Sequence, residues 1–122
     1  MSREILNTVG LSVVALILAA GQFLFKMTAD RSPAIGHFAD VRHLLGDPLL
    51  WLALALYGFA TLLWVFLLQR VALSHAYPFA ALAFVLVPIG AATFFGERLS
   101  GTFLVGTVLI VVGICVTGLS RN

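Results

Sequence analysis

Charged residues are scarce in this sequence, and their scarcity excludes most classes of protein. Asp, Glu, Lys and Arg together make up only 10% of the chain, whereas 61% of its residues are hydrophobic and the mean hydropathy is +1.11. A soluble domain needs far more polar surface than this to face water. The composition therefore indicates a protein that lies within a lipid bilayer.

Residues that carry out chemistry are also few. Cys115 is the single cysteine, so an intrachain disulfide is impossible, and its place inside an apolar run predicts a small core residue. His37 and Asp40 lie about one helical turn apart, but no serine or cysteine nucleophile accompanies them. His37 and His43 lack a usual helical spacing for metal ligands. We therefore expect no enzyme, no metal site and no cofactor.

Four long apolar runs account for most of the chain: residues 6–25, 49–68, 76–95 and 103–119. A transmembrane helix needs about 20 mostly apolar residues, whereas a membrane β-barrel shows alternating segments of about 10 residues. Because the runs are continuous, they predict an all-α membrane protein, a single domain over residues 1–122 with four transmembrane helices.

Four spans would place both termini on one side of the membrane. The basic residues on that side are Arg3, Arg70 and Arg121, and those on the other are Lys26, Arg31, Arg42 and Arg98. With three basic residues on one side and four on the other, the positive-inside rule gives little preference for either orientation in the membrane. Either the chain inserts both ways, or a partner subunit orients it, or Lys26 and Arg98 belong to functional sites, which favours cytoplasmic termini. Because the basic residues are scattered, we expect membrane lipid rather than nucleic acid as a partner.

The first loop contains a helical pattern. Five apolar residues recur at roughly helical spacing: Ile35, Phe38, Val41, Leu44 and Leu45. Ser32 and Pro33 suit the start of a helix and Gly46 to Pro48 its end, so we predict a short amphipathic helix on the membrane surface between the first two spans. It is either an ordinary connector or a lid that contacts headgroups through Arg31, His37 and Arg42.

Polar side chains inside apolar spans are costly, so they are the first candidates for a functional site. Gln22 and Lys26 are one turn apart and share a face of the first helix. Lys26 either extends to the membrane surface or binds a phosphate, with Gln22 hydrogen-bonded beside it. Tyr57 and Trp64 share a face of the second span, where they line a path or simply pack.

Two prolines lie in the third span. Pro78 falls near its predicted start, where a missing N–H group costs nothing. Pro88 lies well inside, where it frees a carbonyl and kinks the helix, and Gly90 eases the bend. Such breaks occur where neighbouring helices or a cavity satisfy the backbone. We expect a cavity wall and a hinge here, the alternative being a kink without a part in transport.

Small residues form a stripe on the fourth span. Gly106 and Gly113 are seven residues apart, Thr117 follows one turn later, and Leu109 and Ile110 lie between the glycines. Small residues on one face let helices approach closely. Because four helices are too few to enclose a transport path comfortably, we expect this stripe to form a dimer interface rather than an internal contact.

Several segments together resemble a known superfamily: AGQFLFKMT at 20–28, LWVFLLQRVALSHAYP at 63–78, FFGERLSG at 94–101 and VGTVLIVVGI at 105–114. They are similar to the four-helix branch of the drug/metabolite transporter superfamily, with its small multidrug resistance proteins and EamA-like half-transporters. The likeness covers nearly the whole chain apart from the surface loop. It implies a multi-pass transporter of the bacterial inner membrane that works as a homodimer or a heterodimer.

One substitution separates the chain from the multidrug branch of this superfamily. Multidrug members carry a membrane-embedded glutamate in the first helix, which binds protons and cationic drugs in turn. The corresponding residue here is Leu18. The resemblance therefore argues against proton-coupled export of cations.

The closer likeness is to the paired small subunits of the flippase for undecaprenyl-phosphate-linked aminoarabinose, which share GQ-x-x-x-K, LW-x-x-x-LQ and AYP motifs. This resemblance implies that the chain moves a lipid-linked sugar, or a related phosphate lipid, between leaflets. It implies a substrate path that contains Gln22, Lys26, Trp64, Gln69, Tyr77, Pro78 and Glu97. Two alternatives remain, a small exporter of cations or metabolites and a non-transporting membrane subunit of a glycosyltransferase system.

Overall fold

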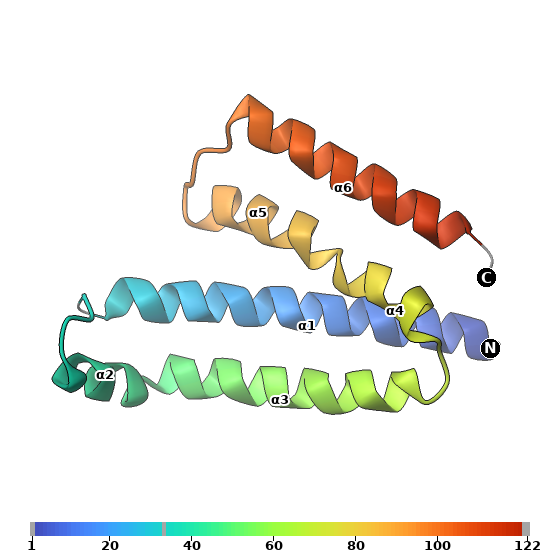
Figure 1. Cartoon of the computed structure of the whole chain (residues 1–122). Helices are drawn as coiled ribbons and strands as arrows, with labels where there is room; N and C mark the ends of the chain where they lie inside the picture. Colours follow the sequence, from blue (N-terminus) through green and yellow to red (C-terminus); the bar gives the residue numbers. More distant parts are fainter. Residues whose placement is uncertain (1, 33, 121–122) are drawn as a thin grey trace.

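The computed structural model describes residues 2–32 and 34–120, and every regular element among them is a helix (Figure 1). The helices are α1 (Arg3–Arg31), α2 (Phe38–Leu45), α3 (Pro48–Leu68), α4 (Leu73–Ala80), α5 (Ala83–Phe94) and α6 (Gly101–Leu119). Four segments are long and apolar enough to cross a membrane: α1, α3, α4 together with α5, and α6. The expected all-α fold with four candidate spans and a short helix between the first two is confirmed.

Helix α1 is longer than its apolar run and continues past residue 25 through several polar residues. The Thr28 hydroxyl donates to the Leu24 carbonyl at 2.8 Å, and Lys26 pairs with Asp30 one turn further along the helix. At 1.5 Å per residue, its 29 residues extend over about 43 Å, beyond the roughly 30 Å of a hydrocarbon core. The end of α1 therefore reaches the headgroup region.

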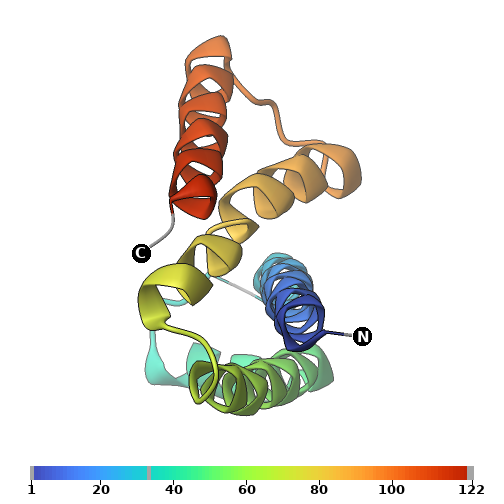
Figure 2. The same ribbon diagram turned by 90° about the vertical axis from the view of Figure 1, so that its right-hand side faces the viewer.

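Helices α1 and α3 lie side by side and carry most of the buried residues (Figures 1 and 2). Leu11, Val14 and Leu67 form a small core with Ala76 of α4. Alanines on the facing sides of α1 and α3 are also buried: Ala15, Ala19, Ala53 and Ala60. Small side chains let two helices approach closely in a membrane, so this pair forms the packed part of the molecule.

The third span is interrupted, and one detail of the prediction is wrong. The helix begins at Leu73, which places Pro78 inside α4 rather than at its start. The interruption lies at Ala81–Leu82. Pro88 lies well inside α5, as expected, and a kink at this proline stays a prediction.

Gly90 has a packing role that the sequence did not indicate. It is buried in α5, and a Cβ atom at this position would overlap the ring of Phe23 from α1. The ring of Phe23 also contacts that of Phe94, with centroids 6.0 Å apart. Gly90 thus allows α1 and α5 to pack closely, and its predicted role in easing a bend stays a prediction.

The surface helix α2 starts later than predicted. It begins at Phe38 instead of near Ser32, and Pro33 lies outside the described residues. The Asp40 carboxylate accepts the N–H groups of Gly36 and His37 at 2.9 and 3.0 Å. Satisfying backbone donors at this point starts the helix here. Its end at Gly46 is confirmed.

Helix α6 contacts α4 and α5 but stands away from α1 and α3 (Figure 2). No residue of α6 is buried, and Cys115 is exposed. The expectation that Cys115 is a core residue is therefore wrong, because its helix has no partner on that side within the described chain. The start of α1 and the end of α6 lie at the same end of the bundle (Figure 1).

Candidate functional site

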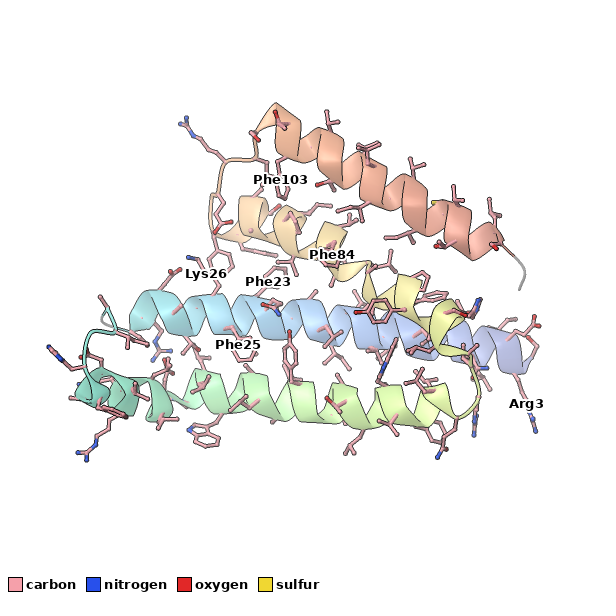
Figure 3. The ribbon with its side chains drawn as sticks, in the orientation of Figure 1. Arg3, Phe23, Phe25, Lys26, Phe84 and Phe103 are labelled. Carbon is pink, nitrogen blue, oxygen red and sulfur yellow. The ribbon has the colours of Figure 1, made fainter. Side chains whose placement is uncertain are left out.

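An apolar cavity of about 550 Å³ lies between α1, α5 and α6. Its lining residues are Gln22, Ala83, Phe84, Val87, Pro88, Phe103, Gly106, Thr107 and Ile110. Phe84 and Phe103 lie on the two sides of the space between α5 and α6 (Figure 3). The cavity brings together three features that sequence reasoning had treated separately: the Gln22 face, the Pro88 segment and part of the Gly106 stripe.

Gln22 is the polar group that this cavity presents. The hydroxyl of Thr107 is already bonded to the Phe103 carbonyl at 3.0 Å. The side-chain amide of Gln22 donates to the Tyr57 hydroxyl on α3, which in turn donates to the Leu18 carbonyl at 3.4 Å. This chain orients the Gln22 amide and leaves its oxygen available as an acceptor.

Tyr57 is held by close packing as well as by hydrogen bonds. A Cβ atom at Gly21 would overlap its ring, and the ring of Phe25 lies 5.2 Å away between centroids. Trp64, on the same face of α3, packs against the small core instead of the cavity. Tyr57 therefore holds Gln22 in position without lining the cavity itself, while Trp64 is part of the packed α1–α3 pair.

Lys26 shares the Gln22 face and lies on the side of α1 toward α5 (Figure 3). Its amino group is 3.1 Å from the Asp30 carboxylate, and its side chain is 46% exposed. An exposed pair of this kind contributes little stability, so another anion can compete for the lysine. Sequence reasoning missed Asp30, although the spacing of four residues between opposite charges is a recognisable signal.

Glu97 lines a second hollow of about 380 Å³, which shares Val87, Pro88 and Phe103 with the apolar cavity. It follows Gly96, whose φ of 66° is a left-handed conformation that glycine adopts without strain. This turn brings a carboxylate next to the apolar cavity. Sequence reasoning had placed Glu97 on the path only through the family resemblance.

Three other predicted path residues lie away from the cavity. Gln69 is the exposed C-cap of α3. Tyr77 is 64% exposed, and the half-buried Pro78 lies beside it in α4. None of the three is among the residues that line the space around Gln22.

The predicted lid residues are also divided. Arg31 and Arg42 line a hollow at the junction of α1, α2 and α3 together with His43, which sequence reasoning had left out. His37 precedes α2 and donates its backbone N–H to Asp40. The hydrogen bonds from Gly36 and His37 lower the pKa of the Asp40 carboxyl below its ordinary value of 3.8, because they favour the charged form.

The predicted dimer stripe lines hollows within the subunit over much of its length. Gly106 and Ile110 line the apolar cavity, and Thr117 lines a polar hollow near the start of α1. Gly113 lies on the same face, because seven residues make almost two helical turns, and a Cβ atom there would meet nothing within 4 Å. Leu109, at the edge of the stripe, is 66% exposed. A dimer interface on this stripe stays a prediction.

The chemistry of these residues suits binding better than catalysis. Among residues 2–32 and 34–120, no group of three His, Cys, Asp or Glu side chains could hold a metal ion. Apolar walls with one oriented amide can hold a hydrocarbon chain with a polar group at its end. Lys26 lies outside those walls, and Glu97 and Arg98 bring charges of opposite sign to the adjoining hollow.

Comparison with known proteins relates the chain to a group of transport subunits. It is 39% identical over 108 residues to a protein of Pseudomonas aeruginosa strain PAO1 described as a probable 4-amino-4-deoxy-L-arabinose-phosphoundecaprenol flippase subunit ArnE, covering 86% of this chain and 90% of that protein. Proteins of the same description from Aeromonas hydrophila and Sodalis glossinidius are each 36% identical, covering 88% of this chain and 93% of theirs.

No family profile and no solved structure matches the sequence. The identity to these relatives nevertheless extends over most of both chains, and it confirms the resemblance found in the sequence motifs. The chain therefore belongs to the family of ArnE flippase subunits.

Proposed function

We propose that this chain is a half-transporter that moves 4-amino-4-deoxy-L-arabinose-phosphoundecaprenol, or a closely related lipid-linked sugar, between the leaflets of the bacterial inner membrane. Its relatives are named as subunits of the flippase for that lipid, a transport protein rather than an enzyme. The observation that carries the proposal is the apolar cavity between α1, α5 and α6, with the Gln22 amide in its wall.

The cavity suits the hydrocarbon part of such a substrate. Its walls are aliphatic and aromatic, and its volume of about 550 Å³ accommodates part of a polyprenyl chain while the rest stays in the bilayer. Gln22 would hydrogen-bond the polar group next to the chain. The sugar amine is a cation, for which Glu97 would supply a partner in the adjoining hollow.

Lys26 would hold the substrate phosphate. It lies one turn from Gln22 on the same face of α1, and its present partner Asp30 is half exposed. The substrate phosphate is a diester, whose single negative charge is shared by two free oxygens that accept charge-assisted hydrogen bonds. Because the exposed Lys26–Asp30 pair contributes little stability, this phosphate would displace Asp30 from the lysine. Asp30 would then keep Lys26 in place between transport cycles.

Movement would come from the interrupted third span. Unwound segments in transporter helices lie near substrate sites and divide the helix into parts that move separately. The turn at Ala81–Leu82 joins α4, which touches the packed core through Ala76, to α5, which lines the cavity through Phe84 and Pro88. Rotation of α5 about this turn would open the cavity toward one leaflet and then the other.

A second four-helix subunit, identical or related, would complete the path. The relatives are described as subunits, and Leu109, at the edge of the predicted stripe on α6, is exposed. The dimer would place two cavities near each other. With the start of α1 and the end of α6 at one end, both termini would lie on the cytoplasmic side, and the α2 end, with Arg31, His37 and Arg42, would contact headgroups on the other side.

The test is transport of the lipid-linked aminosugar in proteoliposomes that contain the chain and its partner subunit. Substrate that reaches the outer leaflet is labelled by an amine reagent that does not cross the membrane. We expect Lys26→Ala to reduce the labelling rate at least tenfold, and Lys26→Arg to retain most of it. Asp30→Ala is the matched control, because it breaks the same ion pair but keeps the lysine. Wild-type transport in Lys26→Ala would refute the phosphate role, and no transport with any aminosugar lipid would refute the proposed function.

A further inference from the structure

A basic hollow of about 590 Å³ lies where α1 ends, α2 passes and α3 begins. We call it the junction hollow, and its polar lining residues are Arg31, Ser32, Arg42, His43 and Asp47. It is built from different helices than the apolar cavity, which lies between α1, α5 and α6. The two sites therefore have to be explained separately.

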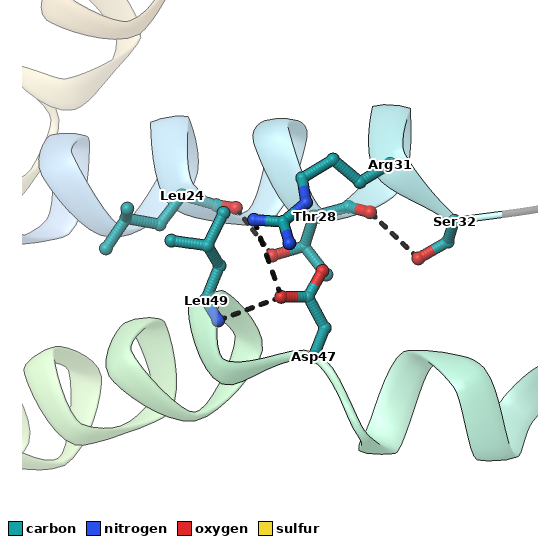
Figure 4. Close-up of polar contacts among 6 residues, drawn as sticks. All are labelled: Leu24, Thr28, Arg31, Ser32, Asp47 and Leu49. Atoms are coloured by element: carbon teal, nitrogen blue, oxygen red, sulfur yellow. Dashed lines mark hydrogen bonds and ion pairs between the residues drawn. The ribbon is translucent and has the colours of Figure 1, made fainter.

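The acidic residue of the junction hollow is already occupied by internal partners. Asp47 is 8% exposed, and its carboxylate accepts the Leu49 N–H at 3.0 Å as the N-cap of α3. The same oxygen lies 3.8 Å from the Arg31 guanidinium (Figure 4). Asp47 thus joins α1 to α3 and holds Arg31 at the edge of the hollow.

The remaining charge of the hollow is positive. The side chain of Arg42 makes no hydrogen bond or ion pair within residues 2–32 and 34–120. His43 interacts electrostatically with Asp40, but the Asp40 carboxylate is engaged by the N–H groups of Gly36 and His37. Because Asp47 is paired with Arg31, Arg42 gives the hollow its net positive charge, and His43 lies beside it.

The surroundings place this hollow at the level of lipid headgroups. Phe38, at the start of α2, is 94% exposed, and Ile35 and Leu45 are exposed as well. Trp51 is exposed at the start of α3 and donates its indole N–H to the Leu45 carbonyl at 2.6 Å. Tryptophan and exposed apolar residues of a short amphipathic helix are typical of the membrane interface.

We propose that the junction hollow binds the phosphate of an anionic phospholipid of the bilayer itself. Arginine pairs with phosphate oxygens through two parallel N–H groups, so Arg31 and Arg42 can hold one phosphate between them, with the Ser32 hydroxyl nearby. Phe38 and Leu45 contact the acyl chains of the same leaflet. The bound lipid holds the α1–α2–α3 end at the membrane surface, whichever substrate the apolar cavity takes.

The experiment is native mass spectrometry of the full chain in detergent, titrated with phosphatidylglycerol or with phosphatidylcholine. We expect the wild type to prefer phosphatidylglycerol. Arg31→Gln and Arg42→Gln should each weaken the binding of phosphatidylglycerol about fivefold, because each substitution removes one basic contact with the lipid. The double variant should weaken it on the order of thirtyfold, because the two losses multiply. Phosphatidylcholine binding should stay unchanged, which shows that the variants remain folded. Arg3→Gln, which removes an exposed charge at the opposite end (Figure 3), should bind like the wild type.

Four results would overturn the proposal. They are an unchanged lipid preference in the double variant, an equal loss in Arg3→Gln, displacement of phosphatidylglycerol by millimolar inorganic phosphate, and displacement by the lipid-linked aminosugar at lower concentration. The third would assign the hollow to free phosphate and the fourth to the transport substrate. Failure of the Lys26 transport test would leave this proposal standing, because the two experiments use different residues and different lipids.

Discussion

The two halves of the molecule are packed in opposite ways. In the first half, α1 and α3 meet through alanines and through Gly21, where the Tyr57 ring lies against the helix backbone. In the second half, the third span is interrupted and α6 has no buried residue. The first half is therefore a scaffold that is stable by its own contacts. The second half carries the cavity and the uncovered surface, and it needs lipid or a partner subunit to complete its packing.

The largest effect on folding should come from Gly21→Leu. A side chain at this position overlaps the Tyr57 ring, so α1 and α3 would have to separate, at a cost of about 3 kcal/mol or more. Thermal unfolding in detergent measures the loss. Gly58→Leu is the matched control, because Gly58 lies on α3 with nothing near its Cβ position. Equal destabilisation by both variants would mean that α1 and α3 do not form the scaffold.

The largest effect on transport without loss of folding should come from Gly106→Leu. A Cβ atom at this position meets nothing within 4 Å, and the larger side chain would fill the apolar cavity that Gly106 lines. We expect transport to fall at least tenfold, while thermal stability stays within about 0.5 kcal/mol of the wild type or rises, because leucine favours a helix over glycine. Normal transport in this variant would show that the substrate does not use the cavity.

Gly113→Leu is the matched change two turns further along the same face of α6. Gly113 does not line the apolar cavity, and its Cβ position is equally open within one subunit, so we expect folding of the single subunit to be unaffected. Close helix approach across a dimer interface would be blocked, and cross-linking in membranes should show about tenfold less dimer. An unchanged cross-linking pattern would show that the dimer interface lies elsewhere.

The smallest effect should be the pH dependence of α2. The lowered pKa of Asp40 means that its ionised form stabilises the start of this helix, and that stabilisation is complete above the ordinary pKa of 3.8. As pH falls through the lower folded-state value, the carboxylate is protonated and the stabilisation is lost. The protection of α2 amides from hydrogen exchange, relative to their intrinsic exchange rates, should therefore fall below about pH 3.8 in the wild type, and it should not show this fall in Asp40→Asn. A wild-type profile that matches the variant would contradict this role of Asp40.

Sequence reasoning predicted the elements that depend on composition and local chemistry. The four spans follow from runs of apolar residues, and the end of α2 follows from Gly46. It placed the start of α2 too early because the deciding contact runs from Asp40 back to Gly36 and His37. It did not foresee the interruption at Ala81–Leu82, where neither residue is a proline or a glycine.

The candidate site was only partly predictable. Gln22 and Lys26 stood out as polar residues in an apolar helix, and Glu97 came from the family resemblance. Their neighbours Phe103 and Thr107 had no signal of their own, because they meet Gln22 only through the packing of α6 near α5. Trp64 and Tyr57 shared a face as expected, yet one packs in the core and the other supports the cavity.

By itself, the sequence determined that this chain spans a membrane four times, which polar groups lie within the bilayer, and which family it belongs to. These properties depend on the hydropathy of segments and on residue identity along the chain. Only the tertiary structure decided that Gly90 receives the Phe23 ring, that Gly106 lines one cavity with Gln22, and that Arg31 and Arg42 meet in one hollow. Each of these depends on how helices that are far apart in the sequence are rotated against one another. A membrane span is apolar on all its faces, so its own sequence says little about which face packs against the other helices.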